Sequence, residues 1–77
     1  METIVSLLEE LKSGVDFTSR TDLVDSRVLD SLTILALVSD LEDAFDITIP
    51  AVEIVPQNFN SVAGILAMVD RLRESGF

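Results

Sequence analysis

The fold is decided by residues 29–45, which read LDSLTILALVSDLEDAF. Apolar residues recur here with the spacing of one helix face, namely Ile34, Leu37, Val38, Leu41 and Phe45. Asp30 stands before this stripe, and aspartate is a preferred N-cap because its carboxylate accepts hydrogen bonds from free N–H groups of the first turn. Pro50 lies beyond the stripe. We therefore expect a helix that begins after Asp30 and ends before Pro50.

Two flanking segments show the same periodicity. The first contains Ile4, Leu7, Leu8 and Leu11. Gly14 follows it, and glycine commonly stands just past the end of a helix. The second contains Val62, Ile65, Leu66, Val69 and Leu72. Asn60 or Ser61 is expected to open this last helix. Gly64 costs it roughly 1 kcal/mol of helix propensity relative to alanine, but a small residue there allows close packing.

The connections between these helices differ in kind. Residues 15–29 form a long polar joint, in which Val24, Val28 and Leu29 are expected to pack onto the helices. In the second connection, residues 51–55 between two prolines leave room for one or two helical turns. Residues 47–49 alternate as a short strand would, but no other segment offers them a partner. The sequence therefore predicts an all-α fold: a small antiparallel four-helix bundle of three main helices and one short helix, forming one domain over residues 1–77.

The composition excludes most kinds of active site. The chain has 77 residues with no His, Cys, Trp or Tyr, so a Ser-His-Asp triad, a thiolate nucleophile and a thiolate zinc site are all impossible. No calcium-loop pattern is present, and we expect no metal site. A carboxylate-only hydrolase would need two opposed carboxylates across a cleft. We therefore expect a protein that is not an enzyme.

The charge and hydropathy restrict the partners and the location. The 14 acidic and 5 basic residues give a formal net charge of −9, which disfavours nucleic acid and anionic membranes. The longest apolar run, residues 62–69, is too short to cross a bilayer. Glu2, Glu9 and Glu10 do not fit the basic start of a signal peptide. We expect a cytoplasmic monomer.

Ser31 is the residue on which chemistry is most plausible. If Asp30 is the N-cap, Ser31 is the first residue of the helix, at the positive end of the helix dipole, where an attached phosphate is stabilised. Leu29 and Leu32 are expected to point inward and fix this junction. The alternative is that Asp30 only caps the helix and Ser31 has no further function.

The order of motifs around Ser31 resembles that of the acyl carrier protein family. Asp30-Ser31-Leu32 opens an apolar helix, and residues 41–50 read LEDAFDITIP, where such carriers show a Leu-Glu-acidic-x-Phe-x-Ile-x-Ile-Pro segment. Asn58-Phe59-x-Ser61-Val62 is similar to the segment that opens the final helix in many carriers. The resemblance extends from about Leu23 to Leu72, and the first helix matches in pattern only.

The resemblance implies a function. In such carriers the motif serine, here Ser31 flanked by Asp30 and Leu32, receives 4′-phosphopantetheine from coenzyme A through a phosphodiester, and the thiol of that arm holds an acyl or aminoacyl group as a thioester. The partners implied are a phosphopantetheinyl transferase, an acyl- or aminoacyl-loading ligase, and synthases or transferases with basic docking patches. The pathway could be fatty-acid, polyketide, aminoacyl or D-alanyl transfer.

Some positions depart from the common pattern of the family. Arg27 and Val28 stand where many carriers have glycine. Thr33 and Ala36 replace the acidic residues that fatty-acid carriers usually place soon after the motif, and the entry to the last helix is more like that of D-alanyl or stand-alone specialised carriers. We therefore favour these latter classes.

A partner surface is expected along the central helix. Between Arg27 and Arg71 there is no basic residue but there are seven acidic ones, whose face could dock a basic patch; the alternative is an ordinary solvated face. The central helix has more apolar residues than one buried stripe needs, and we expect most of them to be buried. The alternative is that Leu35, Ala36 and Val38 form an exposed contact patch. The partner contacts predicted are Leu35, Ala36, Glu42, Asp43, Glu53 and Ile54. The competing function is an unmodified helical adaptor that binds basic proteins.

Overall fold

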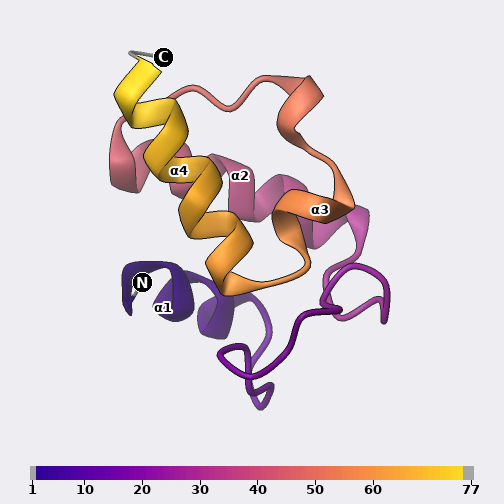
Figure 1. Cartoon of the computed structure of the whole chain (residues 1–77). Coiled ribbons are helices and arrows are strands. Elements are labelled where there is room, and N and C mark those ends of the chain that lie inside the picture. The colour runs from indigo at the N-terminus through magenta and orange to yellow at the C-terminus, as the bar shows by residue number, and fades with distance from the viewer. Residues whose placement is uncertain (1, 76–77) are drawn as a thin grey trace.

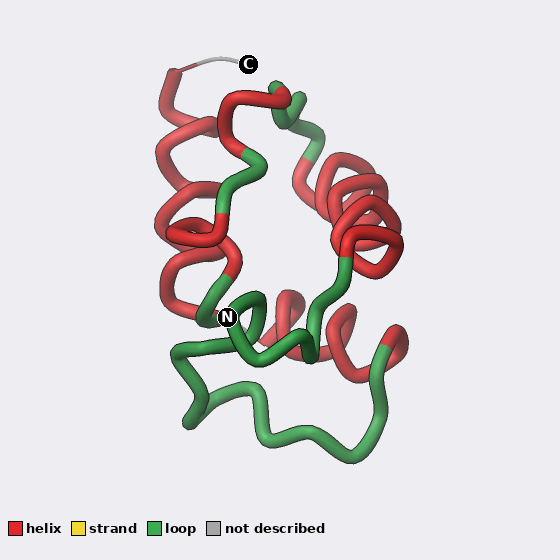
Figure 2. The backbone as a smooth tube through the Cα atoms, turned by 90° about the vertical axis from the view of Figure 1, so that its right-hand side faces the viewer, coloured by secondary structure: helices red, strands yellow, loops and turns green. Residues whose placement is uncertain are grey.

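The computed structural model describes residues 2–75, and these are all helix and loop (Figure 2). The main helices are α1 (Glu2–Leu11), α2 (Ser31–Phe45) and α4 (Val62–Ser75). A short helix, α3 (Pro56–Phe59), and one 3₁₀ turn, η1 (Ala51–Glu53), lie between α2 and α4. No strand occurs within the described range, so the predicted all-α fold with three main helices and one short helix is confirmed.

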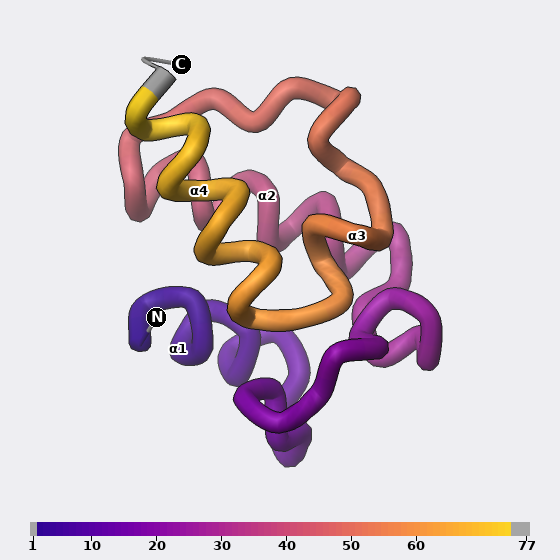
Figure 3. Tube along the Cα trace, in the orientation of Figure 1, coloured from indigo at the N-terminus to yellow at the C-terminus, as the bar shows by residue number. Residues whose placement is uncertain are grey.

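The helices pack around one core. α1 contacts both α2 and α4, α2 contacts α4, and α3 lies against α4. α1 and α2 run in opposite directions, with the start of α2 on the same side of the molecule as α3 (Figures 1 and 3). The ends of α2 and α4 meet, because the guanidinium carbon of Arg73 lies 5.8 Å from the ring centre of Phe45. The start of α2 therefore lies at the end of that helix away from this contact with α4.

The long loop between α1 and α2 contributes to the core. Leu29 is buried as predicted, and Val24 and Val28 pack partly against the core. Phe17 and Leu23 are also fully buried, although the sequence pattern did not single them out. These side chains hold the loop against the helices and account for its order without regular secondary structure.

Both ends of α2 are capped. At the start, Asp30 is the N-cap as predicted, and its Oδ1 accepts a hydrogen bond of 2.8 Å from the Thr33 N–H. At the end, Asp46 adopts the left-handed conformation (φ 53°, ψ 52°) and donates its backbone N–H to the Glu42 carbonyl. Aspartate tolerates this conformation better than most residues, which lets the chain leave the helix well before Pro50.

The short helix lies later than the sequence suggested. Residues 51–55 form only the single turn η1, and the helical turn of α3 begins at Pro56. Proline suits the first helical position because its ring fixes φ and no N–H is needed there. The alternative strand at residues 47–49 does not form. Ile47 and Ile49 are instead buried in the core.

Ser61 and Gly64 determine how α4 begins. The Ser61 Oγ accepts the Gly64 N–H at 3.0 Å, so Ser61 opens the helix as expected. A Cβ on Gly64 would lie 3.2 Å from the carbonyl oxygen of Gln57 and 3.3 Å from that of Asn58. The absent side chain thus allows the backbone of α3 to approach α4 closely.

Candidate functional site

Ser31 occupies the first turn of α2 and is exposed. Within residues 2–75 its hydroxyl makes no hydrogen bond to another side chain or to the backbone. The preceding Asp30 remains a carboxylate, because the hydrogen bond from the Thr33 backbone N–H lowers the pKa of Asp30. Ser31 therefore presents a free hydroxyl at the positive end of a capped fifteen-residue helix, where an attached phosphate is electrostatically favoured.

The chain that leads into Ser31 makes a tight turn. Arg27 has φ 65°, the left-handed conformation that glycine adopts most easily, and its N–H reaches the Val24 carbonyl at 3.0 Å. The Leu29 N–H is bonded to the Leu23 carbonyl at 2.9 Å, and both leucine side chains are buried. The turn that glycine commonly makes in such carriers is thus made here by arginine, and it places Leu29 in the core two residues before Ser31.

One face of α2 beyond Ser31 is exposed and partly apolar. Leu32 is 77% exposed, which contradicts the expectation that it points inward. The side chains of α2 that pack into or against the core are those of the predicted stripe, at positions 34, 37, 38, 41 and 45. At a rotation of about 100° per residue, residue 32 lies on the other side of the helix from that stripe. Leu35 is 58% exposed and Val38 is buried. The exposed face consists of Ser31, Leu32, Leu35, Ala36, Ser39 and Asp43.

The other predicted partner contacts make bonds within the protein. Glu42 accepts the Ile49 N–H through Oε2 at 2.8 Å. Glu53 receives two hydrogen bonds from the Arg71 guanidinium, at 2.7 and 2.9 Å, and these are the main cause of its lowered pKa. Ile54 is half-buried against the core. Of the predicted contacts, Leu35, Ala36 and Asp43 are exposed on one face of α2, with Asp43 about two turns beyond the other two. Glu42, Glu53 and Ile54 instead make contacts that hold the connection between α2 and α4.

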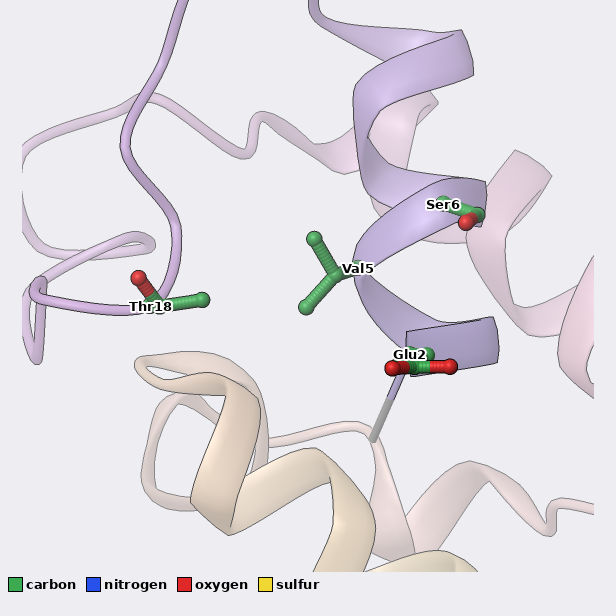
Figure 4. Close-up of a pocket in the computed structure, with 4 residues that line it drawn as sticks. All are labelled: Glu2, Val5, Ser6 and Thr18. Carbon is green, nitrogen blue, oxygen red and sulfur yellow. The ribbon is translucent and has the colours of Figure 1, made fainter.

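A mainly apolar depression of the surface lies away from Ser31, between α1 and the long loop, where Val5 points from the helix toward Thr18, with Glu2 and Ser6 beside it (Figure 4). In the range 2–75, no three acidic side chains gather as a metal site would require. Nor is any helix of that range long and apolar enough to pass through a membrane.

Comparison with known proteins agrees with this geometry. The family model described as "Phosphopantetheine attachment site" matches residues 2–69. A D-alanyl carrier protein of Streptococcus suis is 36% identical over 72 residues, covering 92% of this chain and 91% of the relative. One from Streptococcus pyogenes serotype M5 is 33% identical over 75 residues, covering 96% and 95%. No solved structure matches the chain significantly.

These matches decide between the two functions that the sequence left open. The unmodified adaptor is not favoured, because the family model describes a phosphopantetheine attachment site and the relatives are named carriers. An exposed serine hydroxyl at a helix N-terminus also suits a phosphate-linked group. The chain belongs to the phosphopantetheine-attachment family and is an acyl carrier protein with covalently bound 4′-phosphopantetheine as its prosthetic group.

Proposed function

We propose that Ser31 is the residue that carries the prosthetic group. The observation that supports this assignment is the position of its exposed hydroxyl, on the first residue of α2, directly after the Asp30 cap. Ser39, the other serine of α2, is also exposed but lies in the helix interior, away from the positive helix end. Electrostatic support for a phosphodiester therefore exists at Ser31 and not at Ser39.

The proposed modification is a phosphoryl transfer. The Ser31 oxygen forms a bond to the phosphorus that bears the pantetheine arm, the pyrophosphate bond of coenzyme A breaks, adenosine 3′,5′-bisphosphate leaves, and the serine proton passes to a base of the transferase. This chain contributes the nucleophilic hydroxyl and the helix end that stabilises the new negative charge. The bound arm supplies the thiol that the sequence lacks, and we propose that the chain itself catalyses no reaction and acts as one carrier domain.

We propose that the arm holds an aminoacyl group, and that D-alanine is the first cargo to test. Support comes from the relatives, which are named D-alanyl carrier proteins and align over more than nine-tenths of this chain. A ligase that activates the amino acid with ATP would load the thiol. A D-alanyl transferase would then accept the group. These steps require coenzyme A and ATP, so we place the carrier in the cytoplasm.

We propose that the exposed face of α2 is where partners dock. Leu32, Leu35 and Ala36 would supply apolar contact next to the attachment serine, and Asp43 would pair with a basic residue of the partner. Glu42, Glu53 and Ile54 would act indirectly, by holding the connection after α2 in place.

Intact-mass measurement tests the attachment site. The apo protein is incubated with coenzyme A and a phosphopantetheinyl transferase of broad specificity, and the wild-type mass should rise by one phosphopantetheinyl group. Ser39→Ala is the matched control, because it removes the other exposed hydroxyl of α2, and it should be modified normally. Ser31→Ala should remain apo. Uptake of the group by Ser31→Ala would refute the assignment.

A second experiment tests the cargo. The holo protein is incubated with ATP and a D-alanine-activating ligase, and separately with a malonyl transferase of fatty-acid synthesis. We expect a D-alanyl thioester that hydroxylamine releases, and little malonyl transfer. Efficient malonyl loading without D-alanyl loading would contradict the proposed cargo and leave the attachment site unaffected.

A further inference from the structure

One half-buried residue, Asn60, holds the loop that leads to Ser31. Its Oδ1 accepts the N–H groups of Val24 at 2.9 Å and of Asp25 at 3.1 Å, and its Nδ2 donates to the Asp25 carboxylate at 3.3 Å. Its backbone carbonyl also accepts the Leu23 N–H at 2.9 Å. A single residue between α3 and α4 therefore bonds three consecutive residues that lie some 35 positions earlier in the chain.

These bonds continue to the end of the loop. The Leu23 carbonyl accepts the Leu29 N–H at 2.9 Å, and the Val24 carbonyl accepts the Arg27 N–H at 3.0 Å. Leu29 stands two residues before Ser31. Asn60 thus anchors the first part of a closed turn, and the last part of the same turn delivers the chain to the N-cap of α2.

We infer that Asn60 is a positioning residue for the modification of Ser31, a role that rests on the proposed function of that serine. By fixing the turn of residues 23–29, Asn60 would keep the approach to Ser31 in one conformation. A modifying enzyme that docks at the start of α2 would meet this turn, because the chain enters the helix through it. Without Asn60 the enzyme would have to order the turn while binding, and that cost weakens binding.

The side-chain bonds of Asn60 go to the loop, and none goes to a helix. α2 keeps its Asp30 cap and its buried leucines, Leu37 and Leu41. The Leu23–Asn60 bond uses the main-chain carbonyl and survives a side-chain change. Asp25 is exposed, so water can solvate its freed N–H. Loss of the amide is therefore expected to loosen the turn and to leave the helices folded.

Asn58 provides a matched control. It is also half-buried and lies only two residues earlier, and its Nδ2 donates to the Glu53 carbonyl at 2.7 Å and to the Glu53 carboxylate at 3.1 Å. These bonds tether η1 and do not involve the turn before Ser31. Asn58→Ala and Asn60→Ala thus remove the same amide from neighbouring positions, but only Asn60→Ala releases the approach to Ser31.

The test is the rate at which the transferase modifies each apo protein, measured well below its melting temperature. For Asn60→Ala we expect the KM for the carrier to rise at least about fivefold with kcat almost unchanged, since one net hydrogen bond changes an equilibrium by roughly this factor. Asn58→Ala should keep the wild-type KM. An unchanged KM in Asn60→Ala, or equal rises in both variants, would overturn the inference while the attachment site at Ser31 stands.

Amide exchange and a rescue complete the test. The N–H groups of Val24, Asp25 and Leu29 should exchange faster in Asn60→Ala, while those of α2 beyond its first turn should not. Asn60→Asp should also raise KM, because it sets two carboxylates side by side. Adding Asp25→Asn should restore the wild-type KM, because the double variant again pairs one amide with one carboxylate. If Asn60→Ala does not fold, the comparison of Asn60→Asp with this double variant provides the test. Failure of that rescue would count against the inference. A wild-type chain never modified at Ser31 overturns both proposals.

Discussion

The two leucines Leu35 and Leu37 allow a sharp test of how α2 is used. They lie two residues apart on one helix, so one points away from the core and the other into it. Leu35 is 58% exposed, and Leu37 is fully buried. Truncation of each to alanine removes the same three carbons and leaves a good helix former. Any difference between the variants therefore reports the environment of the side chain.

The structure sets the expected magnitudes. Leu37→Ala should lower the free energy of unfolding by about 2–5 kcal/mol, the range for buried leucines. Transfer of three carbons is worth roughly 2.4 kcal/mol at full burial, so Leu35→Ala should cost at most ~1 kcal/mol at its exposure. For a domain of this size each kcal/mol lowers Tm by about 4–8 °C. Leu37→Ala should therefore melt at least about 8 °C below the wild type.

The rate of thioester loading should be affected in the reverse order, more by Leu35→Ala than by Leu37→Ala. Stability is measured by urea and thermal unfolding, followed by circular dichroism at 222 nm. Thioester loading is measured by intact mass at a temperature where both variants are folded. We expect Leu35→Ala to load more slowly, because it removes apolar contact with the ligase, and Leu37→Ala to load nearly as the wild type does. Equal destabilisation by the two changes would refute the assigned faces of α2. Unimpaired loading of Leu35→Ala would refute docking through its exposed face.

Three further results are expected. Arg27→Gly should be more stable than Arg27→Ala by about 1 kcal/mol in urea, because alanine keeps the strain of a left-handed backbone and glycine does not; equal midpoints would contradict that turn. The Asp30 pKa is lowered in the folded state, so its stabilisation is complete above the ordinary aspartate pKa of about 3.9 and is lost as pH falls through the folded value; Asp30→Asn, which retains a capping oxygen, should show a shallower loss of stability in acid. Loading rates should fall as salt rises, and Asp43→Lys should slow loading more than Glu9→Lys on α1, whereas salt-independent rates would argue against electrostatic docking.

The sequence was sufficient for the features that local chemistry controls. Helix periodicity placed the three main helices, and the capping preference of aspartate placed Asp30 correctly. For the last helix the capping preferences left two candidates, Asn60 and Ser61, of which the structure uses Ser61. Gly64 was recognised as a position where a small residue permits close packing. Each of these predictions depends on residues within one or two turns of each other, so the pattern contains the information needed.

The features that the sequence missed depend on distant contacts. Phe17 and Leu23 carry no periodic signal because they lie in an irregular loop, and only packing against the helices buries them. Leu32 was placed inward because α2 is apolar on more than one stripe. Periodicity reports how apolar each face is, but the position of neighbouring elements decides which face is covered. The bonds of Asn60 to the loop likewise span some 35 residues, beyond the reach of a local pattern.

The exposed leucines of α2 and its negative charge would each select a different property of a partner. α2 contains no basic residue, and in the described range the ion pairs of the carboxylates lie elsewhere, at Arg20–Asp22 and Arg71–Glu53. The charge of Asp43 is therefore uncompensated, and it lies on the same face of α2 as Leu32 and Leu35, two to three helical turns further along. Apolar contact supplies affinity, whereas a charge at one end of the patch supplies orientation and a faster encounter. If partners dock on this face as proposed, a partner would need an apolar surface with a basic residue displaced along the helix axis from Ser31.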